Sequence, residues 1–237
     1  MKTILFDLDG TLLPMDQDYF TKGYFKCLAG TMAKHGYDPD TLISAVWKGT
    51  AAMVKNDGSK SNEEAFWEVF FRIFGDRAQS DKAYFDDFYR QNFGNLQLCC
   101  GFNPQAAQAV YLLKQLGYRV ALATNPIFPS IATEARIRWA GLQPEDFALY
   151  TTYENARFCK PNPAYYREVA EKLETAPGDC LMVGNDVGED MIAQTVGMKV
   201  FLLTDCLINK EEQDLSAFPH GGFPQLLKYI HRDFPLF

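Results

Sequence analysis

The stretch TILFDLDGT at residues 3–11 decides the expected fold of this chain. Thr3–Phe6 is a short run with high β propensity, and acidic residues and Gly10 follow it at once. A run this apolar is typical of a strand that is buried on both faces of a sheet. We therefore expect a buried strand over residues 3–6 that carries Asp7 at its carboxyl end.

Similar short apolar runs recur later in the chain, and helical patterns lie between them. This alternation predicts an α/β fold with a doubly wound, parallel sheet. Three further runs are expected to be strands and a fourth is a weaker candidate, namely Arg119–Thr124, Cys180–Val183, Lys199–Leu203 and, as the weaker one, Ala148–Thr152. The helical patterns are Pro104–Leu116, Ser130–Trp139, Pro163–Leu173 and Asp190–Val196.

The segment from residue 16 to residue 95 interrupts the alternation, because it has helical periodicity and no convincing strand. Ser61 and Glu64 have the spacing of a capping box at the start of one of its helices. Aromatic residues recur there at spacings of three and four, which favours packing in a helical core over a cofactor site. We therefore expect an α/β core over 1–15 and 96–237 and a small all-helical domain over 16–95. The expected helices of this domain are Tyr19–His35, Asp40–Asn56, Asn62–Phe74 and Asp81–Asn92.

The composition limits the class of protein. The 237 residues are 47% hydrophobic, which is enough to bury a substantial core. A formal net charge of -7 leaves no basic excess to neutralise phosphates along a strand, so no nucleic-acid partner is expected. No apolar run approaches the roughly 20 residues that span a bilayer, and Asp7 and Asp9 interrupt the opening too early for a signal peptide. The six cysteines form no C-x-x-C pair, which agrees with a cytoplasmic protein. Together these features predict a cytoplasmic protein without a membrane partner.

Polar residues follow the predicted strands at the points where an open parallel sheet binds its ligands. These residues are Asp7 and Asp9 after the first strand, Thr124 and Asn125 after the second, and Asn185, Asp186 and Asp190 after the third. Four carboxylates in one crevice repel each other unless a cation is bound between them, and oxygen ligands favour Mg²⁺. The sequence therefore predicts a magnesium site at Asp7, Asp9, Asp186 and Asp190.

Four motifs along the chain resemble those of the haloacid dehalogenase superfamily, in its phosphatase branch. Asp7-Leu8-Asp9-Gly10-Thr11 resembles the D-x-D-G-T signature, and Thr124 after its strand resembles the second motif. Lys160-Pro161-Asn162-Pro163 resembles the third, and Gly184-Asn185-Asp186 with Asp190 resembles the fourth. The resemblance implies a Rossmann-like core, and the helical insertion resembles the cap that follows the first motif in many members. Such a cap is expected to move about hinges at Leu12–Asp16 and Phe93–Phe102.

The resemblance also implies roles for individual residues. Asp7 would be the nucleophile that forms an aspartyl phosphate, and Asp9 would be the general acid and base. Thr124 would donate a hydrogen bond to the phosphoryl oxygens, with the backbone of Asn125 assisting at the start of a helix. Lys160 would neutralise the charge that develops there. The implied activity is magnesium-dependent hydrolysis of a small phosphorylated metabolite.

The metal ligands implied by the resemblance leave two readings open. The carboxylates of Asp7 and Asp186 would bind Mg²⁺ together with the main-chain carbonyl of Asp9. Asn185 stands where many members have an acid, which leaves the division of roles in this motif undecided. Either Asp186 binds the metal while Asp190 acts through water or orients the lysine, or the two exchange roles, and we favour Asp186 as the ligand.

Two other functions remain compatible with these motifs. A phosphomutase of the same superfamily shares both acids of the first motif and differs in keeping water away from the aspartyl phosphate. A non-catalytic metal-binding regulatory module could keep the fold and the acids without turnover. Asp9 favours hydrolysis of phosphate esters, because dehalogenases need no proton donor there and a regulatory module has no reason to keep one. Both a monomer and a homodimer fit the sequence.

Overall fold

The expected strand at Thr3–Phe6 forms as β1 and lies inside a five-stranded parallel sheet. The structure is a computed structural model and describes residues 1–236. The strand order is β2-β1-β3-β4-β5, and every neighbouring pair is parallel. The other strands are β2 at Arg119–Leu122, β3 at Cys180–Gly184, β4 at Lys199–Leu203 and β5 at His220–Gly221.

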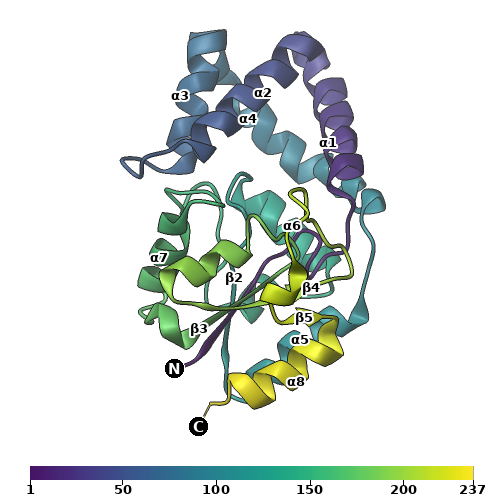
Figure 1. Ribbon diagram of the computed structural model, residues 1–237. Helices are drawn as coiled ribbons and strands as arrows, with labels where there is room; N and C mark the ends of the chain where they lie inside the picture. Colours follow the sequence, from purple (N-terminus) through teal and green to yellow (C-terminus); the bar gives the residue numbers. More distant parts are fainter. Residues whose placement is uncertain (237) are drawn as a thin grey trace.

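Helices cover both faces of this sheet (Figure 1). Alternate residues of β1 point to opposite faces, so that Phe6 packs in one buried cluster and Leu5 in another. The Phe6 cluster contains residues of α5 (Pro104–Gln115), α6 (Ser130–Trp139) and α8 (Phe223–Asp233). The Leu5 cluster contains residues of α7 (Pro163–Lys172) and of the 3-10 helix η5 (Met191–Val196). This arrangement confirms the predicted α/β fold class.

A helical unit stands above one edge of the sheet (Figure 1). Ser61 and Glu64 form the predicted capping box, with Glu64 N donating to Ser61 Oγ and Ser61 N donating to Glu64 Oε2. The last helix begins at Asp76, five residues before its predicted start, because Gly75 at a φ of 68° separates it from the preceding helix. The helices of the unit are α1 at Gln17–Met32, η1 at Ala33–His35, α2 at Pro39–Val54, α3 at Asn62–Phe74, α4 at Asp76–Gln91 and η2 at Phe93–Cys99. The domain limits at residues 15/16 and 95/96 stay a prediction.

Several elements differ from the sequence expectation. Ala148–Thr152 runs beside β2 but forms only one isolated bridge, between Tyr150 and Leu122. The predicted helix at Asp190–Val196 is the 3-10 helix η5, and β5 and α8 were not predicted at all. The remaining 3-10 helices are η3 at Pro144–Asp146, η4 at Pro177–Asp179 and η6 at Leu215–Ala217. Within the described part of the chain, no helix combines the length and the apolar character that crossing a bilayer requires.

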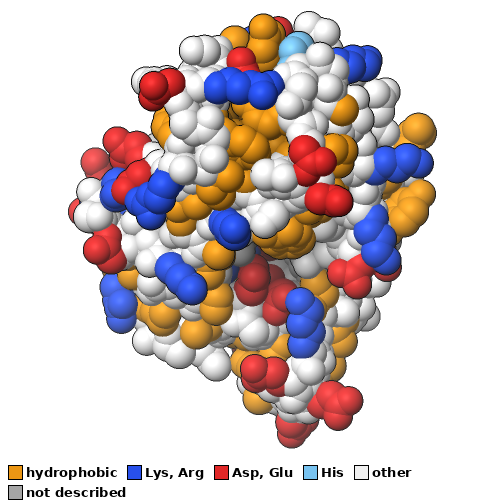
Figure 2. All heavy atoms as spheres, turned by 90° about the horizontal axis from the view of Figure 1, so that it is seen from above, with side chains coloured by type: hydrophobic (Ala, Val, Ile, Leu, Met, Phe, Trp, Pro, Cys, Tyr) orange, Lys and Arg blue, Asp and Glu red, His pale blue; other side chains and the backbone are white. Residues whose placement is uncertain are grey.

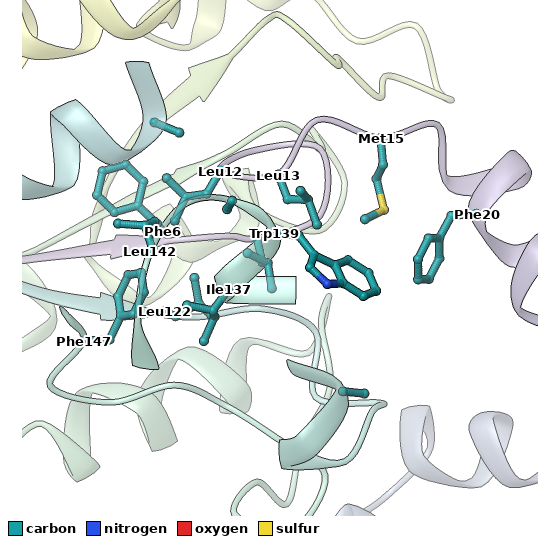
Figure 3. Packing of buried hydrophobic residues seen from close by; sticks show 14 of the residues in the cluster. Phe6, Leu12, Leu13, Met15, Phe20, Leu122, Ile137, Trp139, Leu142 and Phe147 are labelled. Carbon is teal, nitrogen blue, oxygen red and sulfur yellow. The ribbon is translucent and has the colours of Figure 1, made fainter. Parts of the chain in front are cut away.

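The apolar core runs without a break from the sheet into the helical unit. Figure 3 shows Trp139 between the packed residues beside the sheet and Phe20 of α1. The ring of Phe93 stacks on Trp139 with centroids 5.4 Å apart. The two segments expected to be hinges are themselves packed. Leu12 is fully buried, and an isolated antiparallel β-bridge joins Met15 to Cys100. The helical unit therefore shares its core with the α/β part.

A second attachment joins the helical unit to the α/β part at the start of α3. Asn62 is fully buried, and its main-chain N–H donates to the carbonyl of Ala156 at 2.8 Å. The N–H of Glu63 donates to the carbonyl of Tyr153, also at 2.8 Å. The side-chain amide of Asn62 donates to the carbonyl of Pro126 at 3.3 Å. We refer to these contacts as the Asn62 attachment.

Candidate active site

A cavity of about 210 Å³ lies between the carboxyl ends of the strands and the helical unit. Figure 2 looks down on this side of the molecule and shows a recess with acidic side chains at its bottom, bordered by hydrophobic side chains. The site residues predicted from the sequence line this cavity with the exception of Lys160, which lies behind it. The lining members of that set are Asp7, Asp9, Thr124, Asn125, Asp186 and Asp190.

Lys160 links two of the predicted acids. Its Nζ lies 2.8 Å from Asp7 Oδ1 and 2.6 Å from Asp190 Oδ1, and all three side chains are buried. The other oxygen of Asp190 accepts the main-chain N–H of Asp186 at 3.0 Å. Asp190 therefore uses both oxygens within the protein, which fits the favoured reading, in which Asp186 would bind the metal and Asp190 orients the lysine. A Cβ added at Gly184 would lie 2.1 Å from Asp190 Oδ2, so only glycine leaves room for this arrangement.

Burial and charge act in opposite directions on the Asp7–Lys160 pair. Burial is the largest influence on Asp7 and raises its pKa to about 7, although the Lys160 charge lowers it. Burial alone would lower the pKa of Lys160, but the carboxylates of Asp190 and Asp7 raise it well above its usual value. The lysine is therefore held as a cation. An additional positive charge beside Asp7 would favour the ionised form of the Asp7 carboxyl.

Arg136 of α6 forms an ion pair with Asp9 that the sequence analysis did not predict. The guanidinium Nη1 contacts Asp9 Oδ2, and the guanidinium carbon lies 4.5 Å from the centroid of the Phe128 ring. Asp9 Oδ1 is buried and has no hydrogen-bond partner among the described residues. The sequence held one signal, because Arg136 stands four residues from Ala132 and from Ala140, which is the spacing of one helix face. The structure buries all three, with Ala140 directly after α6.

The two protein cations change the argument for a metal. Arg136 pairs with Asp9 and Lys160 with Asp190, so the four carboxylates repel each other less than their number suggested. Consistent with this, no three His, Cys, Asp or Glu side chains of residues 1–236 are grouped as a ready metal site. A cation would therefore have to bind chiefly to the carboxylates that keep an available oxygen.

Asp186 and Asn185 differ in this respect. Asp186 Oδ1 accepts the main-chain N–H groups of Gly188 and Glu189 at 2.8 and 2.9 Å, and neither bond uses Oδ2. Asn185 uses both ends of its amide, because Oδ1 accepts from Thr11 Oγ1 at 2.9 Å and Nδ2 donates to a carbonyl at 2.7 Å. The donor set that fits Mg²⁺ in this fourth motif is therefore the carboxylate of Asp186.

Thr124 and Asn125 are held rigidly at the end of β2. The carbonyl of Thr124 accepts hydrogen bonds from Thr151 Oγ1 at 2.7 Å and from the Tyr165 hydroxyl at 2.8 Å. Asn125 Nδ2 donates to Glu189 Oε2 at 3.1 Å. The expectation that Asn125 begins a helix is wrong, since α6 starts only at residue 130 and the intervening segment contains two prolines.

Comparison with known proteins agrees with these motifs. A model of the family "haloacid dehalogenase-like hydrolase" matches residues 1–193. A phosphoglycolate phosphatase of Vibrio vulnificus is 28% identical over 212 residues, which are 86% of this chain and 84% of the relative. The bifunctional riboflavin kinase/FMN phosphatase of Arabidopsis thaliana is 31% identical over 97 residues, 41% of this chain and 25% of the relative. The crystal structure of a 2-haloacid dehalogenase from Pseudomonas syringae has a similar fold, with a TM-score of 0.64, 18% identity and coverage of 98% and 99% of the two chains.

The family match extends over all four motifs, from Asp7 to Asp190. The two relatives described above carry a phosphatase activity in their names, which together with the family match confirms the predicted enzyme class. The chain belongs to the haloacid dehalogenase-like hydrolase family, as its four sequence motifs predicted.

Proposed function

We propose that the protein is a magnesium-dependent phosphohydrolase that cleaves a small phosphate monoester through a phosphorylated Asp7. The observation that carries this proposal is the contact of Lys160 with both Asp7 and Asp190 beneath a cavity that Asp9 also lines. A carboxylate can serve as the nucleophile because the acyl phosphate that it forms is labile to water. The family match and the phosphatase relatives support the same reaction class.

The reaction divides into two displacements at phosphorus. In the first, an oxygen of Asp7 bonds to phosphorus, the ester P–O bond breaks, and Asp9 gives its proton to the departing oxygen. In the second, Asp9 takes a proton from water while that water oxygen bonds to phosphorus. The P–O bond to Asp7 breaks, and inorganic phosphate and the free carboxylate result.

Lys160 and Thr124 would stabilise the charge that develops on the phosphoryl oxygens. The cationic Nζ of Lys160 holds Asp7 at 2.8 Å and offsets negative charge brought next to it. Thr124 is fixed through its carbonyl, so its hydroxyl can donate to a phosphoryl oxygen without a further rearrangement of the backbone. Both groups are in place before a substrate binds, which keeps the reorganisation small.

Mg²⁺ would be held by the carboxylates of Asp7 and Asp186 and by the main-chain carbonyl of Asp9. When bound, the ion supplies positive charge that reduces the repulsion between a carboxylate nucleophile and a phosphoryl group. The donors are hard oxygens, as this ion prefers. Asp190 suits the role less well, because Lys160 and the main chain of Asp186 engage both of its oxygens.

The covalent intermediate gives the direct test of this function. We expect acid quenching during turnover of phenyl phosphate with Mg²⁺ to leave one phosphoryl group on the peptide that contains Asp7, as measured by mass spectrometry. Addition of a chelator should remove both this modification and phosphate release. The proposal would be contradicted if phosphate were released while no peptide carried a phosphoryl group. Turnover that persists in the presence of the chelator would contradict it as well.

The Arg136–Asp9 pair predicts a selective effect on the chemical step. In Arg136→Met, Asp9 loses the cation that orients its carboxyl, so we expect kcat to fall by about 100-fold while KM changes by less than about 3-fold. Arg136→Lys should recover part of the loss in kcat, because it keeps the charge. Arg138→Met is the matched control, since Arg138 lies on the same helix and pairs with Glu134 at the surface. An equal loss in both methionine variants would refute a role for the Asp9 pair.

A further inference from the structure

The part of the cavity that faces the helical unit is lined by neutral side chains, most of them aromatic. All four main helices of the unit contribute to this lining. The aromatic residues include Phe20, Tyr24 and Phe25 of α1, Trp47 of α2, and Phe66 and Trp67 of α3. Several pack on each other in the core of the unit, and their inner edges reach the cavity. A leaving group bound above the phosphate position would therefore touch aromatic rings.

The lining of the whole cavity contains no positively charged side chain among the described residues. Among the described residues, no Lys, Arg or His lines the cavity, whereas five carboxylates do. The two buried cations nearby are already engaged, Lys160 with Asp7 and Asp190, and Arg136 with Asp9. Figure 2 shows lysine and arginine side chains around the recess, on the surface. A negatively charged leaving group would therefore be buried without a partner, among acids and apolar rings.

The cavity offers hydrogen-bond partners for a group that is polar but uncharged. Thr21 and Thr50 line it, as do Tyr24 and Tyr89, whose hydroxyls are hydrogen-bonded to each other at 2.9 Å. Trp47 also lines the cavity and keeps 52% of its surface exposed. At about 210 Å³, the cavity is smaller than the roughly 300–1,000 Å³ typical of sites for drug-sized ligands. Its size suits a compact leaving group.

We propose that the substrate is a phosphate monoester of a small, uncharged alcohol or phenol with a largely apolar, ring-sized body. This inference rests on the proposed function, because it concerns the leaving group of the same reaction. It sets the chain apart from the Vibrio vulnificus relative, since phosphoglycolate, the compound in that protein's name, carries a carboxylate. The neutral aromatic lining selects against such an acid at the position beyond the phosphate.

A matched pair of substrates tests the proposal on the unmodified protein. Phenyl phosphate and 4-carboxyphenyl phosphate differ by one carboxylate, which makes the phenolate no worse a leaving group. With Mg²⁺ at neutral pH, we expect kcat/KM to be at least about 30-fold higher for phenyl phosphate than for 4-carboxyphenyl phosphate, and to exceed the value for phosphoglycolate as well. Equal rates within the pair, or a preference for phosphoglycolate, would overturn the inference while leaving phosphate hydrolysis intact.

A charge introduced into the lining gives an independent readout. In Thr50→Lys, a cation in the cavity should shift the ratio of kcat/KM values toward 4-carboxyphenyl phosphate by about 10-fold relative to Thr50→Met, which matches the length without the charge. No shift between the two variants would count against the proposed role of the neutral lining. If the unmodified protein releases phosphate neither from these three compounds nor from any other phosphate ester, the proposed function itself fails.

Discussion

The Asp7→Asn variant should retain less than about one part in 10⁴ of the kcat of the unmodified protein toward phenyl phosphate. The substitution keeps the shape of the side chain, but an amide cannot form the acyl phosphate that water then hydrolyses. The fold should persist, because Lys160 keeps its contact with Asp190 at 2.6 Å. Phosphate release and circular dichroism on the same preparation measure the two effects.

The specificity of this loss needs a control at another aspartate. Asp40 is exposed in the first turn of α2 and takes no part in the candidate active site, so Asp40→Asn should keep the kcat of the unmodified protein. Asp7→Asn should also lose the phosphoryl group from its peptide after acid quenching. A variant at Asp7 that retains more than about one hundredth of the activity would rule out covalent catalysis by this residue.

Lys160→Met is expected to lower both stability and activity. Removing the cation leaves the carboxyl groups of Asp7 and Asp190 buried without their partner, which costs about 3–5 kcal/mol in the free energy of unfolding at a pH above 7, where the ionised forms are favoured. We expect kcat to fall by about 10³-fold, because the cation beside Asp7 that offsets the negative charge of the phosphoryl group is lost. Urea unfolding and steady-state kinetics measure the two losses.

The stability loss in Lys160→Met should depend on pH in a defined direction. Burial already raises the pKa of Asp7 from 3.8 to about 7, and loss of the lysine raises it further. A carboxyl whose pKa is higher in the folded than in the unfolded state destabilises the fold increasingly as the pH rises above the unfolded value. Below about pH 6 the Asp7 carboxyl is protonated in both folded proteins, so its contribution to the deficit should be small there and should grow as the pH rises through 7 and above. A deficit that shrinks as the pH rises past 7 would contradict the charge argument.

A double variant separates lost charge pairing from lost packing. Adding Asp190→Asn to Lys160→Met removes one of the two unpaired carboxylates, so the double variant should be more stable than additivity predicts by at least about 1 kcal/mol. Lys210→Met, at an exposed lysine, serves as the control and should change stability by less than about 0.5 kcal/mol. Strict additivity would mean that the buried pair carries no coupling.

The parts of the fold that were predicted correctly depend on local patterns. Thr3–Phe6 and Asn62–Phe74 have the predicted bounds, because a four-residue apolar run and a capping box each specify their element nearby. β5 has two residues and no pattern of its own, since its pairing with β4 defines it. Helix α8 was not predicted, although its buried residues Phe223, Leu226 and Ile230 recur at helical spacing.

The candidate site divides in the same way. The predicted residues come together because the carboxyl ends of parallel strands share one edge, so order along the chain was sufficient to group them. The Arg136–Asp9 pair joins residues 127 positions apart in different elements, and no local pattern specifies such a partner. The aromatic lining was correctly read as core packing, but only the arrangement of the four helices shows that the same rings also border the cavity.

The Asn62 attachment has a consequence for how substrates reach the acids. A helical unit fixed both through its linkers and through Asn62 cannot swing outward about the linkers alone, because hydrogen bonds to Ala156 and Pro126 and shared ring packing would break together. While these contacts hold, the cavity of about 210 Å³ cannot widen by an outward swing of the helical unit. We therefore expect compact phosphate esters to reach the nucleophile more readily than bulky ones.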